Sequence, residues 1–177
     1  NVFVKAGTGT MTIQLGGATV WTGNSSVTAG TLRLNNNSGL PSTGIWTMGN
    51  SAQPALLDFN GINATVGGLS FYGTAAAITS QGTVTLGGAV VTITGTSTTN
   101  NSNNPRAASI TGGTLNMTAA RTFDVRDSMI VANTDAELLI TSDWSGAAGG
   151  ILKVGGGNLK ITGTFGMTGT IANTFNS

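Results

Sequence analysis

The chain has 177 residues, of which 39% are hydrophobic, so it is long enough to form one domain with a buried core. Only 7% of the residues are charged, the net charge is +1, and no polybasic run points to a nucleic-acid surface. Cysteine and histidine are absent, which excludes disulfides, thiol chemistry and Cys/His zinc sites.

Short runs in which apolar and polar residues alternate follow one another along the whole chain. Each run is bounded by Gly, Asn, Ser or Thr, and none has a helical period, which is typical of strands with one buried face. The sequence therefore predicts an all-β fold. In chain order the apolar positions are Met11/Ile13, Leu32/Leu34, Val84/Leu86, Val91/Ile93, Leu115/Met117, Phe123/Val125, Leu138/Ile140, Leu152/Val154 and Leu159/Ile161.

One segment occurs twice. Residues 4–13 read VKAGTGTMTI, and residues 152–161, 148 positions later, read LKVGGGNLKI. A chain that repeats itself is built by stacking similar units, so we predict a single parallel β-solenoid over residues 1–177, with roughly seven or eight rungs. A β-sandwich would show similar alternation and is the structural alternative.

The region from Thr96 to Arg106 interrupts the pattern. It reads TSTTNNSNNPR, with one proline and no apolar residue. This composition is typical of a polar loop, so we predict that residues 96–106 form an Asn-rich loop that protrudes between rungs.

The first copy of the repeated segment continues into a longer pattern. Phe3, Lys5, Gly7 and Gly9 are followed by Trp21-Thr22-Gly23 and by residues 27–34, which read VTAGTLRL. This pattern resembles the passenger-associated strand repeat of bacterial autotransporters and related surface proteins. The resemblance implies a right-handed parallel β-helix that is secreted to the bacterial cell surface, with the chain spanning just over one large repeat unit of a longer protein. The second copy departs from the pattern, because Asn158 stands where the family prefers Thr and no clear aromatic-Thr-Gly follows.

The repeat is not specific for any activity, but a coil whose rungs pair with one another around a continuous core suits a structural role, so we expect a non-enzymatic segment of a surface rod, sheath or filament. Its expected partners are other copies or flanking repeats joined end to end, with no nucleic acid and no membrane insertion. An adhesin or glycan-binding passenger domain is the alternative, with a surface glycan as partner. Aromatic rings and amides are the groups that stack on and bind sugars, but we expect the aromatic residues to cap or fill the core of the solenoid rather than to form an exposed platform. The candidate ligand contacts are Trp21, Trp46, Tyr72, Trp144, Asn101 and Asn103.

Two acidic clusters are the candidates for chemistry, since polysaccharide-active enzymes on this fold would need clustered carboxylates. Asp124 and Asp127 flank Arg126, with Arg121 nearby, and they form either an acid/base site or a surface ion pair. Asp135, Glu137 and Asp143 form either a calcium site or structural turns. No third acid or histidine joins the first group, and the second matches no known calcium-loop spacing. We therefore expect an ion pair and structural turns, with no catalytic residue, metal or cofactor.

Overall fold

The computed structural model describes residues 1–14, 16, 21–36, 40–49, 53–72, 82–100, 108–127, 136–146, 150–167 and 174–175. In these segments every regular element is a β-strand, and every strand pairing is parallel. The parallel pairing rules out the sandwich, because sandwich sheets are built from antiparallel strands. The described part of the chain contains no helix, and so none with the length and hydropathy needed to cross a membrane.

The strands form three parallel sheets, called A, B and C here. Sheet A has eight strands in the order β1 (Phe3–Lys5), β3 (Ser25–Val27), β5 (Ile45–Gly49), β8 (Gly68–Tyr72), β11 (Ser97–Asn100), β14 (Ala120–Val125), β17 (Gly150–Val154) and β20 (Thr174–Phe175). Sheet B has seven, β2 (Thr10–Ile13), β4 (Gly30–Leu34), β6 (Ala55–Asp58), β9 (Thr83–Thr85), β12 (Ala108–Thr111), β15 (Leu138–Ile140) and β18 (Leu159–Ile161). Sheet C has five, β7 (Ala64–Val66), β10 (Val90–Ile93), β13 (Thr114–Asn116), β16 (Asp143–Gly146) and β19 (Phe165–Met167).

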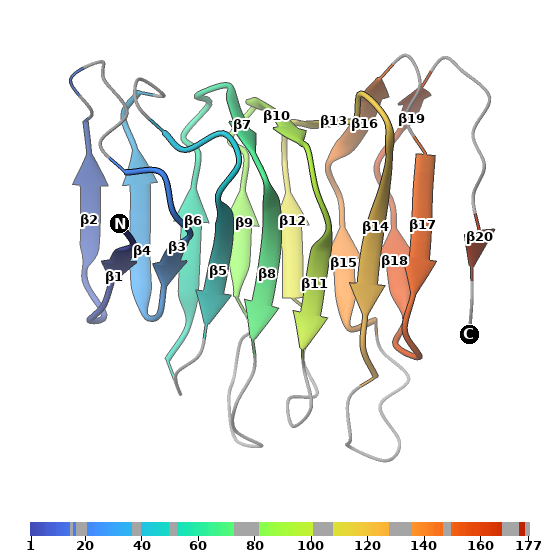
Figure 1. The fold of residues 1–177 in the computed structure, drawn as a ribbon, viewed down its shortest axis with the longest axis horizontal. Coiled ribbons are helices and arrows are strands. Elements are labelled where there is room, and N and C mark those ends of the chain that lie inside the picture. Colours follow the sequence, from blue (N-terminus) through green and yellow to red (C-terminus); the bar gives the residue numbers. More distant parts are fainter. Residues whose placement is uncertain are drawn as a thin grey trace.

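The chain visits the sheets in turn and so forms a coil. In Figure 1 the strands of sheet A descend on the near side, those of sheet B ascend on the far side, and sheet C lies along the top. Because the coil advances from left to right, this path is right-handed. The predicted right-handed parallel β-helix is confirmed.

The number of turns is somewhat smaller than predicted. About five turns carry a strand in all three sheets, whereas the sequence predicted seven or eight rungs. The difference arises in the first two turns, where β1 and β2 are followed directly by β3 and β4, and these by β5, with no strand of sheet C in the described residues between them. Sheet A itself does contain eight strands.

Inward side chains from successive rungs form continuous columns. The central column of sheet B runs from β2 to β18 through Met11, Leu32, Leu57, Val84, Ile110, Ile140 and Ile161. Its five inner members are 0% exposed. Fully burying one such side chain contributes about 1.5–3 kcal/mol, so these columns are the main source of stability.

The predicted polar loop begins later than residue 96. Ser97–Asn100 form β11, which pairs with β8 on one side and β14 on the other. Two hydroxyl side chains, Ser97 and Thr99, occupy inward positions and are 1% exposed. The remaining residues of the predicted loop, 101–106, lie outside the described residues.

Candidate functional site

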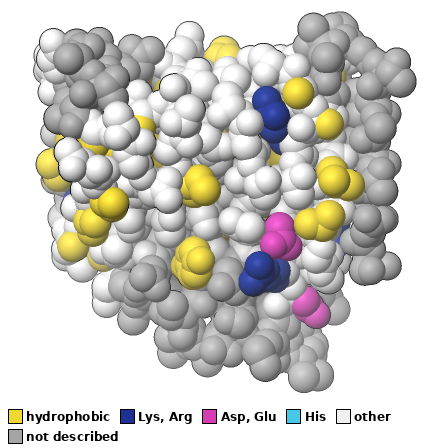
Figure 2. Space-filling view, in the orientation of Figure 1, with side chains coloured by type: hydrophobic (Ala, Val, Ile, Leu, Met, Phe, Trp, Pro, Cys, Tyr) yellow, Lys and Arg dark blue, Asp and Glu magenta, His cyan; other side chains and the backbone are white. Residues whose placement is uncertain are grey.

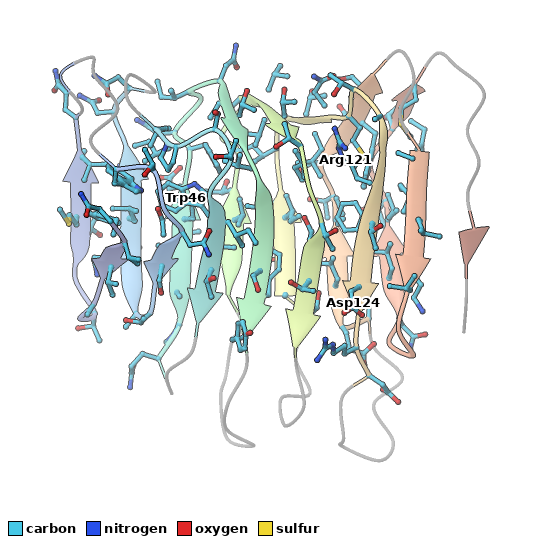
Figure 3. The ribbon with its side chains drawn as sticks, in the orientation of Figure 1. Trp46, Arg121 and Asp124 are labelled. Carbon is cyan, nitrogen blue, oxygen red and sulfur yellow. The ribbon has the colours of Figure 1, made fainter. Side chains whose placement is uncertain are left out.

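The three tryptophans lie in the core and cannot form a surface platform. Trp21, Trp46 and Trp144 are 6%, 0% and 1% exposed, respectively. Trp21 stacks on Phe3 with ring centroids 5.1 Å apart and meets Trp46 edge-on at 6.3 Å. The structure therefore agrees with the core-filling interpretation of these residues, and Figure 3 shows Trp46 within the coil.

The other candidate ligand contacts are not brought together. Tyr72, at the end of β8, is 37% exposed. Asn101 and Asn103 lie outside the described residues. Among the described residues, Tyr72 is thus the one member of the set with a side chain open to a ligand.

The Asp124–Arg126 pair is a surface ion pair. Arg126 Nε donates to Asp124 Oδ2 at 3.2 Å, and the side chains are 59% and 23% exposed. Exposed pairs of this kind contribute little, typically below about 1 kcal/mol. Arg121 does not join them. It lies at the other end of β14 (Figure 3), where its Nε donates to the carbonyl of Ile93 at 2.9 Å.

The second acidic group stabilises turns between rungs. The Glu137 carboxylate accepts the backbone N–H of Asn158, and the Asp143 carboxylate accepts that of Thr164 at 2.8 Å. Asp135 lies outside the described residues. Over the described segments, no group of three acidic, cysteine or histidine side chains could hold a metal ion.

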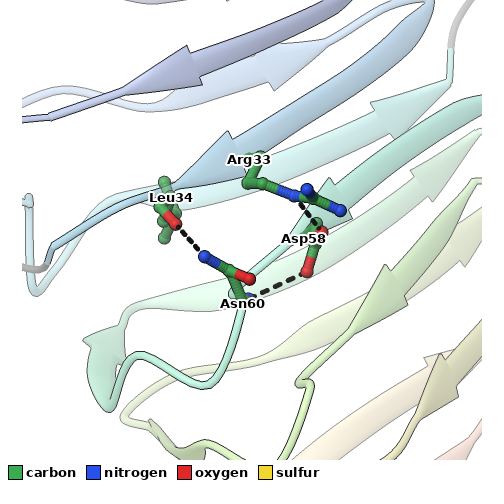
Figure 4. A network of polar contacts seen from close by, with 4 residues as sticks. All are labelled: Arg33, Leu34, Asp58 and Asn60. Atoms are coloured by element: carbon green, nitrogen blue, oxygen red, sulfur yellow. Dashed lines mark hydrogen bonds and ion pairs between the residues drawn. The ribbon is translucent and has the colours of Figure 1, made fainter.

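A polar network missed by the sequence analysis lies on the outer side of sheet B (Figure 4). Arg33 Nε donates to Asp58 Oδ2 at 2.7 Å, while the N–H of Asn60 donates to Asp58 Oδ1 at 2.8 Å. Asn60 Nδ2 then donates to the carbonyl of Leu34 at 3.2 Å. Asn60 has a φ of 52°, so the Asp58 carboxylate holds a left-handed turn and also joins two rungs. The alternation could have indicated this pair, because Arg33 and Asp58 both occupy outward positions of strands in sheet B.

One shallow groove lies along the corner between sheets A and B. Its volume is about 510 Å³, and its lining includes Thr8, Thr31 and Leu56. The described residues that line it supply hydroxyl and apolar groups and the amide of Gln53, and none of them is charged or aromatic.

The ends of the coil are chemically distinct from its sides. Met11 is 41% exposed although its neighbour in the column, Leu32, is 0% exposed. At the other end, Phe165 is 49% exposed and stacks on Trp144, which is 1% exposed. Figure 2 shows hydrophobic side chains toward the left edge, where the coil begins, a second group on the right-hand part of this face, and isolated ones over its centre. The two ends are therefore the strongest candidate interaction sites.

Searches of protein-family models, curated proteins and solved structures found no match to this chain.

Proposed function

We propose that this chain is a non-enzymatic structural segment of an extracellular bacterial rod, sheath or filament, and that it extends through contacts at the ends of its coil. The observation that carries this proposal is the abrupt change in burial at the two ends. The core columns stop at exposed apolar side chains, Met11 at one end and Phe165 at the other, and the terminal strands pair on one side only among the described residues. Open edges beside apolar surface favour pairing with another chain or with flanking repeats.

The lateral surface supports a structural role. Outward side chains hydrogen-bond from rung to rung: Asn116 Nδ2 donates to Thr92 Oγ1 at 3.0 Å, and Ser145 Oγ donates to Asn116 Oδ1 at 3.2 Å. These contacts tie successive rungs together on the outside, in addition to the backbone ladder and the core. The resemblance to autotransporter passenger repeats supports a location at the bacterial cell surface. A glycan-binding role has less support, because the three tryptophans are buried.

Concentration-dependent association of the purified chain tests the proposal. We expect sedimentation velocity to show larger species as concentration rises, and negative-stain images to show copies stacked end to end. Met11→Lys and Phe165→Lys place a charge at the two ends and should each weaken association at least tenfold. Val90→Lys is the matched control, because Val90 is 39% exposed but lies on β10, between β7 and β13 in sheet C.

Two outcomes would count against the proposal. One is a chain that stays monomeric at all concentrations while binding to a glycan array. The other is loss of association in Val90→Lys equal to that in the end variants, since this would mean that side faces make the contact.

A further inference from the structure

Sheet A contains the same structural unit twice. Lys5 and Lys153 come from the two copies of the repeated segment, 148 residues apart, and both side chains are buried, at 6% and 8% exposure. Lys5 Nζ donates to the carbonyl of Gly7 at 2.5 Å, and Lys153 Nζ donates to the carbonyl of Gly155, in each case two residues further along. The two copies therefore agree in side-chain contacts as well as in sequence.

The backbone of the two copies also agrees. Gly7 and Gly155 have φ values of 80° and 83°, in the left-handed region that glycine adopts readily. A turn at this place leads from sheet A into sheet B in both copies, from β1 to β2 and from β17 to β18. The repeat thus reproduces one corner of the coil.

The pairing of each copy with the following strand of sheet A also agrees. In the first copy, Lys5 pairs with Val27 between β1 and β3. In the second copy, Lys153 pairs with Phe175 between β17 and β20. The same offset of 148 residues relates both members of each pair, so the register between successive strands of sheet A is preserved.

From these agreements we infer that β17, β18 and β20 begin a second unit of a 148-residue structural repeat, and that the β1–β2 end of the coil fits the β14–β15 edge of a preceding unit. The inference deepens the proposed end-to-end function, on which it rests, by naming the partner and its register. The junction between two units is then already present in this structure, where β17 pairs with β14 and β18 pairs with β15.

The pairing of β14 with β17 in this chain gives the register expected between β14 of a preceding unit and β1. Thr122 lies opposite Leu152, and Phe123 lies opposite Lys153. At a junction with a preceding unit, Val4 takes the place of Leu152 and Lys5 takes the place of Lys153, because each lies 148 residues earlier in the sequence. Thr122 of one unit would therefore face Val4 of the next, and Val4 is 57% exposed in this chain.

The two copies of the repeated segment are shifted relative to each other along the strand direction. The column below Lys153 runs through Phe123 and Ser97, and at the first rung it reaches Phe3 rather than Lys5. The repeated segment has moved by two residues, about 6.6 Å, along the strand. A shift of two keeps the lysine on the inward face, whereas a shift of one would turn it outward.

A tandem chain, in which residues 1–148 precede the complete 177-residue chain, tests the inference. One unit adds six strands to sheet A, from β1 to β14, so the long dimension in small-angle scattering should grow by about 29 Å. Two separate bodies, or an aggregated tandem chain, would overturn the inference.

Disulfide trapping tests the register, since the chain has no cysteine of its own. We expect Thr122→Cys in the first unit and Val4→Cys in the second to form a disulfide readily under mild oxidation. Thr122→Cys with Leu152→Cys in the single chain is the positive control. Thr122→Cys with Ala6→Cys, shifted by two residues, places the Cα atoms roughly 8 Å apart, beyond the reach of a disulfide.

Equal trapping of the matched and shifted pairs, or trapping of the shifted pair alone, would refute the inference. These results are independent of whether the single chain associates, because the two units are covalently joined. A monomeric single chain combined with correct trapping would contradict only the proposed end-to-end function.

Discussion

Lys5→Met removes a buried ammonium group from the first corner between sheets A and B. Lys5 Nζ donates to the carbonyls of Ala6, Gly7 and Ala29 at 3.2, 2.5 and 2.8 Å. The bond to Ala29 joins the first rung to the second, so the ammonium stabilises the packing of the first rung on the second. Methionine keeps most of the apolar stem but leaves these three carbonyls without a donor.

The expected loss of stability follows from two opposing terms. A hydrogen bond to a charged group contributes about 1.5–3 kcal/mol net, and three bonds from one nitrogen do not add fully. Burying an ammonium without a carboxylate partner costs several kcal/mol, which methionine would recover. We expect the loss of these hydrogen bonds to outweigh the relief of ammonium desolvation by about 2 kcal/mol. This free energy corresponds to a roughly 30-fold increase in the opening equilibrium of the first rungs.

Hydrogen exchange is the suitable assay, because solenoids open locally from their ends. Amides of β1, β2 and β4 should exchange faster in Lys5→Met, while those of β9 and β12 stay unchanged. Lys160→Met is the control, since Lys160 is exposed on β18. Unchanged or slower exchange in β1 and β2 would refute the reasoning, because it would mean that desolvation of the ammonium outweighs its hydrogen bonds.

Three further predictions concern the core and the turns. The buried tryptophans should give blue-shifted fluorescence that acrylamide quenches poorly in the native protein and strongly in urea; strong native quenching would contradict their placement in the core. Gly30→Ala should destabilise the fold far more than Gly88→Ala in urea denaturation. Both glycines have positive φ, but a Cβ at Gly30 would lie 2.5 Å from the carbonyl oxygen of Gly7, whereas nothing lies within 4 Å at Gly88. Equal losses would show that close approach of the backbone is not the cause. Thr99→Val should stabilise the protein by about 1 kcal/mol, because the buried Thr99 Oγ1 has no hydrogen-bond partner among the described residues; a loss of stability in thermal unfolding would indicate an unrecognised partner.

The strands that form the core could be predicted because their inward positions are apolar. Leu32 and Leu34, like Val91 and Ile93, alternate with polar residues and are 0% exposed. Trp144 of β16 pairs with Leu115 of β13, and both side chains are buried. The sequence favoured a core position over a sugar platform for this tryptophan, and the structure agrees.

β11 could not be predicted, because its strand is imposed by its neighbours. Its inward residues, Ser97 and Thr99, are hydroxyl side chains, and no local pattern separates them from a loop. In the coil they lie opposite Phe123 and Val125 of β14, and the backbone ladder on both sides fixes their conformation. Tertiary contacts of this kind override local propensity.

The number of turns could not be predicted for a similar reason. The sequence marks strands but not the sheet to which each belongs, and in the described residues the first two turns carry two strands where later turns carry three. The exposed apolar side chains at the ends of the coil could not be predicted either. Met11 has the same sequence context as inward residues of the middle rungs, and only its position in the first strand of sheet B leaves it 41% exposed.

The low charge of the chain follows from the geometry of the coil. Parallel rungs place equivalent outward side chains about 4.8 Å apart, so a repeated charge would face its own copy in the next rung and repel it. Hydroxyl and amide side chains avoid this repulsion, because each can donate to the rung on one side and accept from the other, as Asn116 does between Thr92 and Ser145. Arg33 and Asp58, which lie in neighbouring rungs, carry opposite charges and form an ion pair. A surface of this composition can lengthen by whole units without accumulating electrostatic repulsion, as the proposed rod would require.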